Sequence, residues 1–185
     1  MATRALEQDE YREIIKLLLE GFKTHTGAIF RPNEQIALIF QLQASLGLRI
    51  GDVLNLHVSN FRNGKLETTE GKTKKLQYRD INPAVSYCVK DYALVKNLQF
   101  RDRLFKISVR GVQKQLKIIT DYLGLNNIGT HSFRKMYATY VYETNNNNIE
   151  LLKELLNHTS VATTQRYIRT SQAVINAASA NVNFI

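Results

Sequence analysis

The sequence of 185 residues has few cysteines, prolines and tryptophans: one cysteine, two prolines and no tryptophan. A single cysteine, Cys88, excludes a disulfide within the chain and is typical of a reducing compartment. No apolar run approaches the roughly 20 residues of a transmembrane helix, and the first residues lack the apolar centre of a secretion signal. We therefore expect a soluble cytoplasmic protein without a membrane partner. Apolar residues flank Cys88, which predicts a buried small side chain rather than a nucleophile.

Common motifs of metal and serine chemistry are also missing. The four histidines show no H-E-x-x-H spacing, and the chain has no C-x-x-C pair. A nucleophile elbow of the form G-x-S-x-G is absent as well. We expect neither a metal site nor another cofactor.

Positive charge is what the chain has in excess. Lysine and arginine total 25 against 16 acidic residues, which gives a formal net charge of +9. A basic globular protein attracts polyanions, and nucleic acid is the commonest one inside cells. The plainer alternative is that many soluble proteins are basic without binding one.

Apolar periodicity predicts a single, mainly helical domain with a small three-stranded antiparallel sheet, an α+β fold. The sheet is expected over 57–82, where strand-forming residues alternate around Asn63-Gly64, a strong hairpin signal. Thr130 is the candidate N-cap of the helix that follows it, and a turn containing Gly27 and Pro32 joins the first two helices. Helices are predicted over 7–22, 33–46, 50–56, 83–99, 108–123, 131–143, 149–156, 161–167 and 172–180.

Two basic segments in the first half of the chain could contact a phosphate. Arg49 lies at a junction between two predicted helices, where an ion pair with Asp52 or a helix cap is the favoured interpretation if it is taken alone. Its functional alternative is a guanidinium directed at a phosphate. Lys72, Lys74 and Lys75 lie in a predicted hairpin turn, where lysines are usually solvated but could donate a proton to a leaving oxygen.

The last third of the chain carries the more specific pattern. His131 and Arg134 are three positions apart at a helix start, so both can face one anion there. A capping histidine and an outward-paired arginine are the structural alternative. His158 and Tyr167 follow, although a lone tyrosine is more often a packing residue than a nucleophile.

Taken in order, five segments resemble the catalytic domain of tyrosine recombinases, the phage integrase family. The resemblance runs over about 33–167, and no one of the segments is specific alone. The segments are Gly47-Leu48-Arg49-Ile50, the hairpin lysine, His131-Ser132-Phe133-Arg134, Leu156-Asn157-His158-Thr159-Ser160 and Thr163-x-x-x-Tyr167.

This resemblance implies metal-free DNA strand cleavage and rejoining through a 3′-phosphotyrosyl intermediate. Tyr167 would attack the scissile phosphate, and Arg49 and Arg134 would hold its non-bridging oxygens. Lys72, with Lys74 as the alternative, would protonate the leaving 5′ oxygen. His131 would assist proton transfer at the tyrosine, and His158 would hydrogen-bond the phosphate.

The resemblance also implies partners: double-stranded DNA, further protomers in a tetrameric synapse, and accessory DNA-bending proteins, in a nucleoid-associated location. The basic residues expected to contact DNA are Lys74, Lys75, Lys135 and Arg166. Residues 170–185 form a C-terminal helix or tail that could dock on a neighbouring protomer or pack on its own domain. Two substitutions depart from the family pattern: Asn157 replaces a usual glycine, and Gly51-Asp52 replaces a usual Ser-Glu.

Family members generally carry an N-terminal DNA-clamping domain, whereas this chain begins almost at the first helix of the catalytic domain. We therefore expect a fragment or a short variant with low specific DNA affinity of its own. Alternatives to a recombinase are a type IB topoisomerase, which uses the same nucleophile chemistry, a non-catalytic DNA-binding protein, and a helical domain with chance motifs.

Overall fold

The computed structural model describes residues 3–168 and 179–180. The secondary-structure elements follow one another as α1 (Gln8–Glu20), β1 (Phe22–Lys23), β2 (Ile29–Phe30), α2 (Glu34–Leu46), α3 (Ile50–Leu54), a 3-10 turn η1 (Val58–Asn60), β3 (Phe61–Arg62), β4 (Lys65–Thr69), β5 (Leu76–Asp80), α4 (Pro83–Val95), α5 (Val109–Tyr122), α6 (Thr130–Thr144), α7 (Ile149–Leu155) and α8 (Val161–Gln165). Within the described residues, no helix has the length and apolar character needed to cross a membrane.

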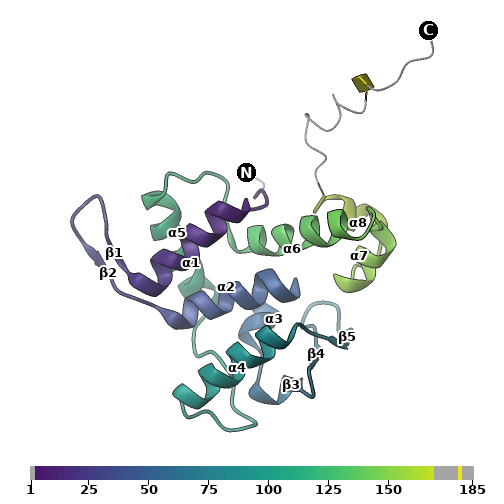
Figure 1. The fold of residues 1–185 in the computed structure, drawn as a ribbon, viewed down its shortest axis with the longest axis horizontal. Helices are drawn as coiled ribbons and strands as arrows, with labels where there is room; N and C mark the ends of the chain where they lie inside the picture. Colours follow the sequence, from purple (N-terminus) through teal and green to yellow (C-terminus); the bar gives the residue numbers. More distant parts are fainter. Residues whose placement is uncertain (1–2, 169–178, 181–185) are drawn as a thin grey trace.

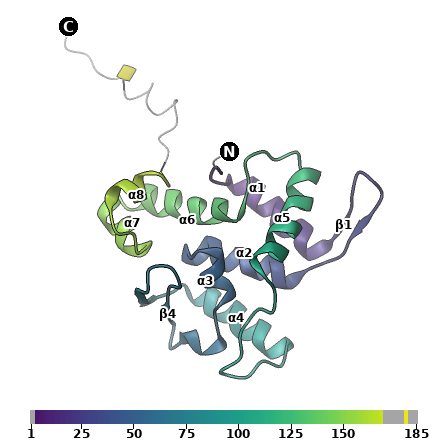
Figure 2. The same cartoon turned by 180° about the vertical axis from the view of Figure 1, so that it is seen from behind.

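Helix α2 lies at the centre of the domain. It packs against α1, α3, α4 and α6, and the two opposite views show these helices around it (Figures 1 and 2). Buried side chains cover most of its circumference, which is expected of a helix enclosed by others. They are Ile36, Ala37, Leu38, Ile39, Phe40, Leu42, Gln43 and Leu46.

The ends of α2 are set by two local signals. Asn33 caps its start, since the side-chain Oδ1 accepts the N–H of Ile36 at 3.2 Å. Gly47 ends it in the left-handed conformation with φ of 63°. A Cβ at Gly47 would lie 2.3 Å from the ring of Tyr137, so this position requires glycine on two grounds.

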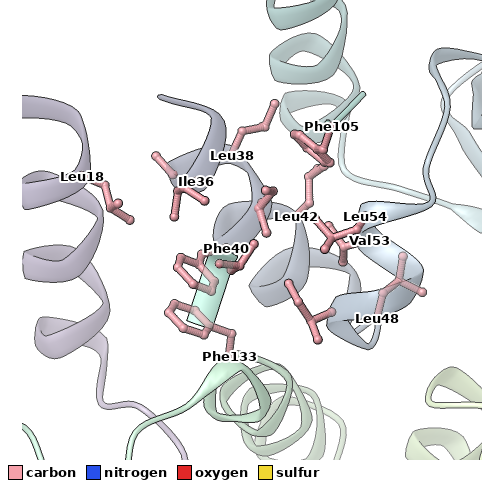
Figure 3. Packing of buried hydrophobic residues seen from close by; sticks show 14 of the residues in the cluster. Leu18, Ile36, Leu38, Phe40, Leu42, Leu48, Val53, Leu54, Phe105 and Phe133 are labelled. Carbon is pink, nitrogen blue, oxygen red and sulfur yellow. The ribbon is translucent and has the colours of Figure 1, made fainter. Parts of the chain in front are cut away.

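The main hydrophobic core joins α2 to α6 through two aromatic rings. Phe40 and Phe133 are both fully buried, and their rings stack with centroids 4.1 Å apart. Figure 3 shows the pair among the aliphatic side chains of the core. This contact fixes the first turn of α6, where Arg134 immediately follows Phe133.

A second, smaller cluster holds α7 and the segment after α8 against the C-terminal half of α6. Its buried members are Ala138, Leu152 and Leu156. Partly buried residues pack around them: Tyr137, Val141, Tyr142, Tyr167 and Ile168. The ring of Tyr167 is therefore held by this cluster. Helices α6, α7 and α8 meet at one edge of the domain (Figure 1).

The three-stranded sheet has the order β3-β4-β5 and is antiparallel throughout. The turn from β3 to β4 is Asn63-Gly64, with φ of 50° and 74°, as a type I′ hairpin requires. The predicted fold class and this hairpin are confirmed. The sequence predicted only a turn before α2, where the structure has the β1–β2 hairpin, because two-residue strands are too short to show alternation.

Three other predictions need correction. Thr130 is the first residue of α6 rather than its cap, because Gly129 occupies the capping position in an extended conformation. Helix α8 ends before Tyr167. Cys88 is exposed rather than buried, because adjacent residues of a helix point in different directions, and α4 turns Val89 and Ala93 inward instead. The helix predicted over 172–180 falls almost wholly outside the described residues.

Replacing Phe133 by alanine is expected to lower the free energy of unfolding by roughly 3–5 kcal/mol, the usual range for a buried phenylalanine. Urea unfolding followed by circular dichroism measures the change. Tyr87→Ala is the control, because Tyr87 is 71% exposed and should change stability by less than about 0.5 kcal/mol. Equal losses in the two variants would contradict the central position of the Phe40–Phe133 stack.

Candidate active site

Arg134 is a fully buried charged side chain of the site. It lies in the first turns of α6 with no exposed surface. Nη1 donates to the carbonyl of Gly47 at 2.6 Å, and Nη2 donates to the carbonyl of Leu156 at 2.8 Å. These carbonyls close α2 and α7, so two helix ends clamp one guanidinium. The outward-paired arginine considered from the sequence is therefore wrong.

The charge of Arg134 lacks an ion-pair partner in the described part of the chain. No carboxylate of the described residues lies within ion-pair distance of it, and its Nε has no hydrogen-bond partner there. Burial lowers the pKa of Arg134, and the nearby charge of Arg49 lowers it further. A buried cation without a counter-ion is unfavourable unless an anion binds beside it. The geometry thus favours an anion-binding site.

Arg49 precedes α3 and reaches across to the β4–β5 hairpin. Its Nη1 lies 2.5 Å from Oε2 of Glu70 and 3.9 Å from Oδ2 of Asp52. The ion pair with Asp52 considered from the sequence is therefore present, but Glu70 is the closer partner. Asp52 instead accepts the N–H of Gly71 through Oδ1 at 2.8 Å.

Glu70 is the residue that the sequence analysis missed. It directly follows the β4 strand, and its carboxylate is fully buried. The signal available in the sequence was an acidic residue two positions before Lys72, at the start of the predicted hairpin turn. Nothing in that pattern shows that the side chain folds inward to meet Arg49.

The hairpin between β4 and β5 holds the three candidate lysines. All are exposed, and Lys74 takes a left-handed conformation with φ of 57°. The charge of Lys72 is among those that lower the pKa of His131. The charge of Lys75 likewise contributes to lowering the pKa of His158. The hairpin therefore approaches both histidines.

His131 lies in the first turn of α6 and is exposed at the surface. The part of its ring that faces the protein is desolvated, and this effect lowers its pKa most. Four nearby cations lower the pKa of His131 further: Arg134, Lys135, Arg49 and Lys72. A neutral imidazole with an accessible nitrogen can accept a proton.

His158 is buried, with 4% of its surface exposed. Its Nε2 lies 3.2 Å from Nη2 of Arg134, and its Nδ1 lies 3.0 Å from Oγ1 of Thr164. A guanidinium can only donate, so Nε2 accepts and the proton of the neutral ring is on Nδ1. Burial, followed by the charges of Arg134 and Arg49, lowers the pKa of His158 to about 4.

Tyr167 follows α8 and is held by its backbone N–H, which donates to the carbonyl of Thr164 at 2.9 Å. Its ring centroid lies 4.9 Å from that of His158. The guanidinium carbon of Arg134 lies 5.7 Å from the same ring. Arg134, His158 and Tyr167 therefore form one contiguous group, with half-buried Tyr167 at its surface.

Lys135 and Arg166 lie to one side of this group. They line a cavity of about 650 Å³ between the start of α1, one face of α6 and Tyr167. The ammonium of Lys135 donates to the backbone carbonyl of Thr3 there. The structure thus places these two candidate DNA contacts apart from the hairpin that carries Lys74 and Lys75.

The other two histidines lie outside the site. His25 stacks on Tyr122 with ring centroids 4.7 Å apart, and the backbone of His57 pairs with Arg103. Within the described part of the chain, no group of three or more His, Cys, Asp and Glu side chains is placed to hold a metal ion.

Asn157 forms the turn between α7 and His158 with φ of 52°. This left-handed conformation is what the usual glycine would allow, and asparagine tolerates it better than most residues. The turn leaves the Leu156 carbonyl directed at Arg134. Asparagine thus supports this turn in place of the usual glycine.

Asn157→Gly is expected to retain the free energy of unfolding of the wild type within a few tenths of a kcal/mol. Asn157→Ala should lose roughly 1–2 kcal/mol, because a Cβ disfavours left-handed backbone. The side-chain Nδ2 is buried without a hydrogen-bond partner among the described residues, so its removal should cost little. An alanine variant as stable as the glycine variant in urea unfolding would rule out this explanation.

The free energy of unfolding should decrease as the pH is lowered, because His158 becomes protonated. Its pKa of about 4 in the fold lies below the ordinary 6.5, so the unfolded chain binds more protons between these values. The resulting stabilisation is fully present above pH 6.5 and is lost as the pH falls towards 4. It amounts to roughly 3 kcal/mol, at ~1.4 kcal/mol per pKa unit. Urea unfolding between pH 7.5 and 4.5 should show a smaller slope in His158→Gln, and an unchanged slope would contradict the assignment.

Comparison with known proteins places this geometry in a family. The family model described as the phage integrase family matches residues 4–173. The probable integrase/recombinase YoeC of Bacillus subtilis is 32% identical over 160 residues, which cover 81% of this chain and 86% of that protein. Tyrosine recombinase XerC of Caldanaerobacter subterraneus subsp. tengcongensis is 30% identical over 179 residues, which cover 90% of this chain and 50% of that protein.

Solved structures share the fold. XerH site-specific recombinase, bound to palindromic difH substrate in a post-cleavage complex, has a TM-score of 0.74 at 19% identity, over 96% of this chain and 52% of that one. A lambda integrase dimer bound to a COC′ core site has a TM-score of 0.68 at 16% identity, over 90% and 59% of the two chains. The chain spans about half the length of several such proteins. It belongs to the phage integrase family of tyrosine recombinases.

Proposed function

We propose that this chain cleaves and rejoins DNA strands in site-specific recombination, with Tyr167 as the nucleophile. One observation carries the proposal: a fully buried arginine, Arg134, has no carboxylate partner among the described residues and lies against the ring of Tyr167. Such an arrangement suits a phosphodiester, whose oxygens supply the missing negative charge. The phenol would then lie beside the phosphorus atom.

Arg49 and Arg134 hold the non-bridging oxygens of the scissile phosphate in this mechanism. Each guanidinium is oriented before DNA binds, Arg134 by two carbonyls and Arg49 by Glu70. Preorganised donors stabilise the charge that develops in a phosphoryl-transfer transition state, because they need no reorganisation. The two arginines with Lys72 take over charge neutralisation that metal ions provide in many phosphoryl-transfer enzymes.

The chemical step exchanges one phosphoester for another. The Tyr167 oxygen bonds to phosphorus and the bond from phosphorus to the 5′ oxygen breaks, which leaves a 3′-phosphotyrosyl link. His131 accepts the phenol proton, and Lys72 gives a proton to the 5′ oxygen, which leaves as a hydroxyl. Attack by a 5′ hydroxyl on the link reverses the step and rejoins a strand without an external energy source.

Lys72 is the better candidate for the acid than Lys74. Its charge contributes to lowering the pKa of His131, and the N–H of the preceding Gly71 donates to the Asp52 carboxylate. Lys74 lies past the tip of the turn. We place Lys74 and Lys75 on the DNA backbone beside the site, and Lys135 and Arg166 as further contacts from the other side of Tyr167.

His158 has two successive tasks in this mechanism. Before DNA binds, its Nε2 accepts from Arg134 and helps to orient it. To hydrogen-bond the phosphate, Nε2 must carry a proton, and the negative charge of the incoming phosphate favours that protonation. The neutral resting state of this ring leaves the free site without a third buried positive charge.

Double-stranded DNA and further copies of the chain are the proposed partners. A related fold solved on its DNA substrate and another solved as a dimer on DNA support them. A tetrameric synapse and accessory DNA-bending proteins would complete the assembly. The DNA-associated location expected from the sequence follows from this function.

Covalent trapping on nicked duplexes with a randomised central sequence tests the nucleophile. The wild type should form a denaturant-resistant adduct that Tyr167→Phe lacks. Arg134→Ala should slow adduct formation by at least about 100-fold, the usual effect of removing a transition-state donor. Tyr140→Phe, the same chemical change at a tyrosine that is 58% exposed on α6, is the matched control and should react normally. An adduct that persists in Tyr167→Phe would sink the assignment.

A further inference from the structure

Glu70 is a buried carboxylate that joins the separate parts of the site. Its side chain has no exposed surface. Oε2 accepts from Nη1 of Arg49 at 2.5 Å and from Oγ1 of Thr73 at 2.8 Å. Oε1 accepts from Nε2 of Gln77 at 3.1 Å, and the same nitrogen reaches the Leu155 carbonyl at 3.3 Å. One carboxylate thus connects the start of α3, the lysine hairpin and the end of α7.

Glu70 is ionised in this environment. Burial alone would raise its pKa, but the hydrogen bonds from Thr73 and Gln77 and the charge of Arg49 lower the pKa below its ordinary value. Its backbone also closes the hairpin, since its N–H donates to the Lys75 carbonyl at 3.0 Å. Side chain and backbone together fix the loop that contains Lys72.

The two carboxylates near Arg49, those of Asp52 and Glu70, make different contacts. Asp52 uses Oδ1 to hold the backbone of Gly71 and stays 3.9 Å from Arg49. Glu70 makes the short contact with the guanidinium. Asp52 therefore anchors the hairpin, and Glu70 sets where Arg49 points.

We propose that Glu70 is a positioning residue for DNA cleavage: its buried carboxylate fixes the Arg49 guanidinium in register with the hairpin that carries Lys72. The proposal rests on the function proposed above. It assigns to Glu70 no contact with DNA, because the carboxylate is enclosed by protein atoms. The residue acts through Arg49 and through the loop.

The contact geometry favours positioning over competition with the phosphate. Glu70 and Asp52 both approach Nη1 of Arg49. In the part of the chain that the structure describes, the other guanidinium nitrogens of Arg49 make no hydrogen bond, and its side chain keeps 17% of its surface exposed. The free edge can therefore meet a phosphate while Glu70 holds the opposite edge, as carboxylates orient metal-binding histidines from behind.

The test compares Glu70→Gln with Glu67→Gln in the full chain. Both remove one negative charge from or next to β4, but Glu67 is exposed. At saturating nicked duplex, Glu70→Gln should form the Tyr167 adduct about 10- to 100-fold more slowly, the effect expected of a catalytic group displaced by about 1 Å. Its apparent Kd for the duplex should match that of Glu67→Gln, since both variants keep every proposed DNA contact.

A double-mutant cycle with Arg49→Ala separates positioning from a general loss of structure. If Glu70 acts through Arg49, adding Glu70→Gln to Arg49→Ala should slow cleavage little further, because coupled residues are not additive. Full additivity of the two effects would overturn the proposal, as would a Glu70→Gln rate equal to that of Glu67→Gln.

A second readout does not depend on cleavage, so the two proposals can fail separately. In the chain labelled with 15N-arginine, the ion pair should restrict rotation of the Arg49 guanidinium and give resolved Nη signals, assigned by their loss in Arg49→Lys. Glu70→Gln should merge these signals and Glu67→Gln should not. A wild type that forms no adduct but shows this pattern would refute only the proposed function.

Thr73→Val covers the case in which Glu70→Gln fails to fold. It removes one hydrogen bond to Oε2 and leaves the carboxylate in place. We expect both effects in weaker form, with cleavage slowed by only several-fold, because Arg49 and Gln77 still hold the carboxylate. Unchanged cleavage together with unchanged Arg49 signals in Thr73→Val would contradict the positioning role.

Discussion

A buried guanidinium, for which the described residues supply no carboxylate partner, is the constraint around which this fold is arranged. The carbonyls of Gly47 and Leu156 that clamp Arg134 come from the ends of α2 and α7. Helix C-termini carry partial negative charge, which stabilises a cation without neutralising it. Two left-handed turns, at Gly47 and Asn157, aim these carbonyls. The result is a stable but incompletely compensated positive centre, as a phosphate-binding site requires.

The rest of the site adds charge around that centre in a controlled way. Glu70 pairs with Nη1 of Arg49, and Asp52 holds the backbone of the lysine hairpin. The opposite edge of the Arg49 guanidinium stays available to an anion. His158 is kept neutral by burial, which avoids a further buried charge until an anion arrives. Lys72 and His131 remain exposed. The groups proposed to transfer protons are thus accessible, whereas Arg134 and His158, proposed to contact the phosphate, are buried.

Features with a local signal in the sequence could be predicted, and features made by tertiary contact could not. Helical periodicity and Asn63-Gly64 predicted most helices and the main hairpin, because apolar spacing and turn chemistry act over a few residues. The ordered motifs indicated the family and the site residues, whose catalytic roles stay predictions. The burial of the Glu70 side chain and the exposure of Cys88 were not predicted, because each depends on which face of an element packs against its neighbours.

The most direct measurement is a crystal structure of Tyr167→Phe bound to a nicked duplex. We expect the scissile phosphate within hydrogen-bond distance of both Arg49 and Arg134, with the Gly47 and Leu156 carbonyls still holding Arg134. The phenylalanine ring that replaces the nucleophile should then lie beside the phosphorus atom. A phosphate bound away from Arg134, or an Arg134 that leaves its two carbonyls to reach the DNA, would contradict a preformed anion site.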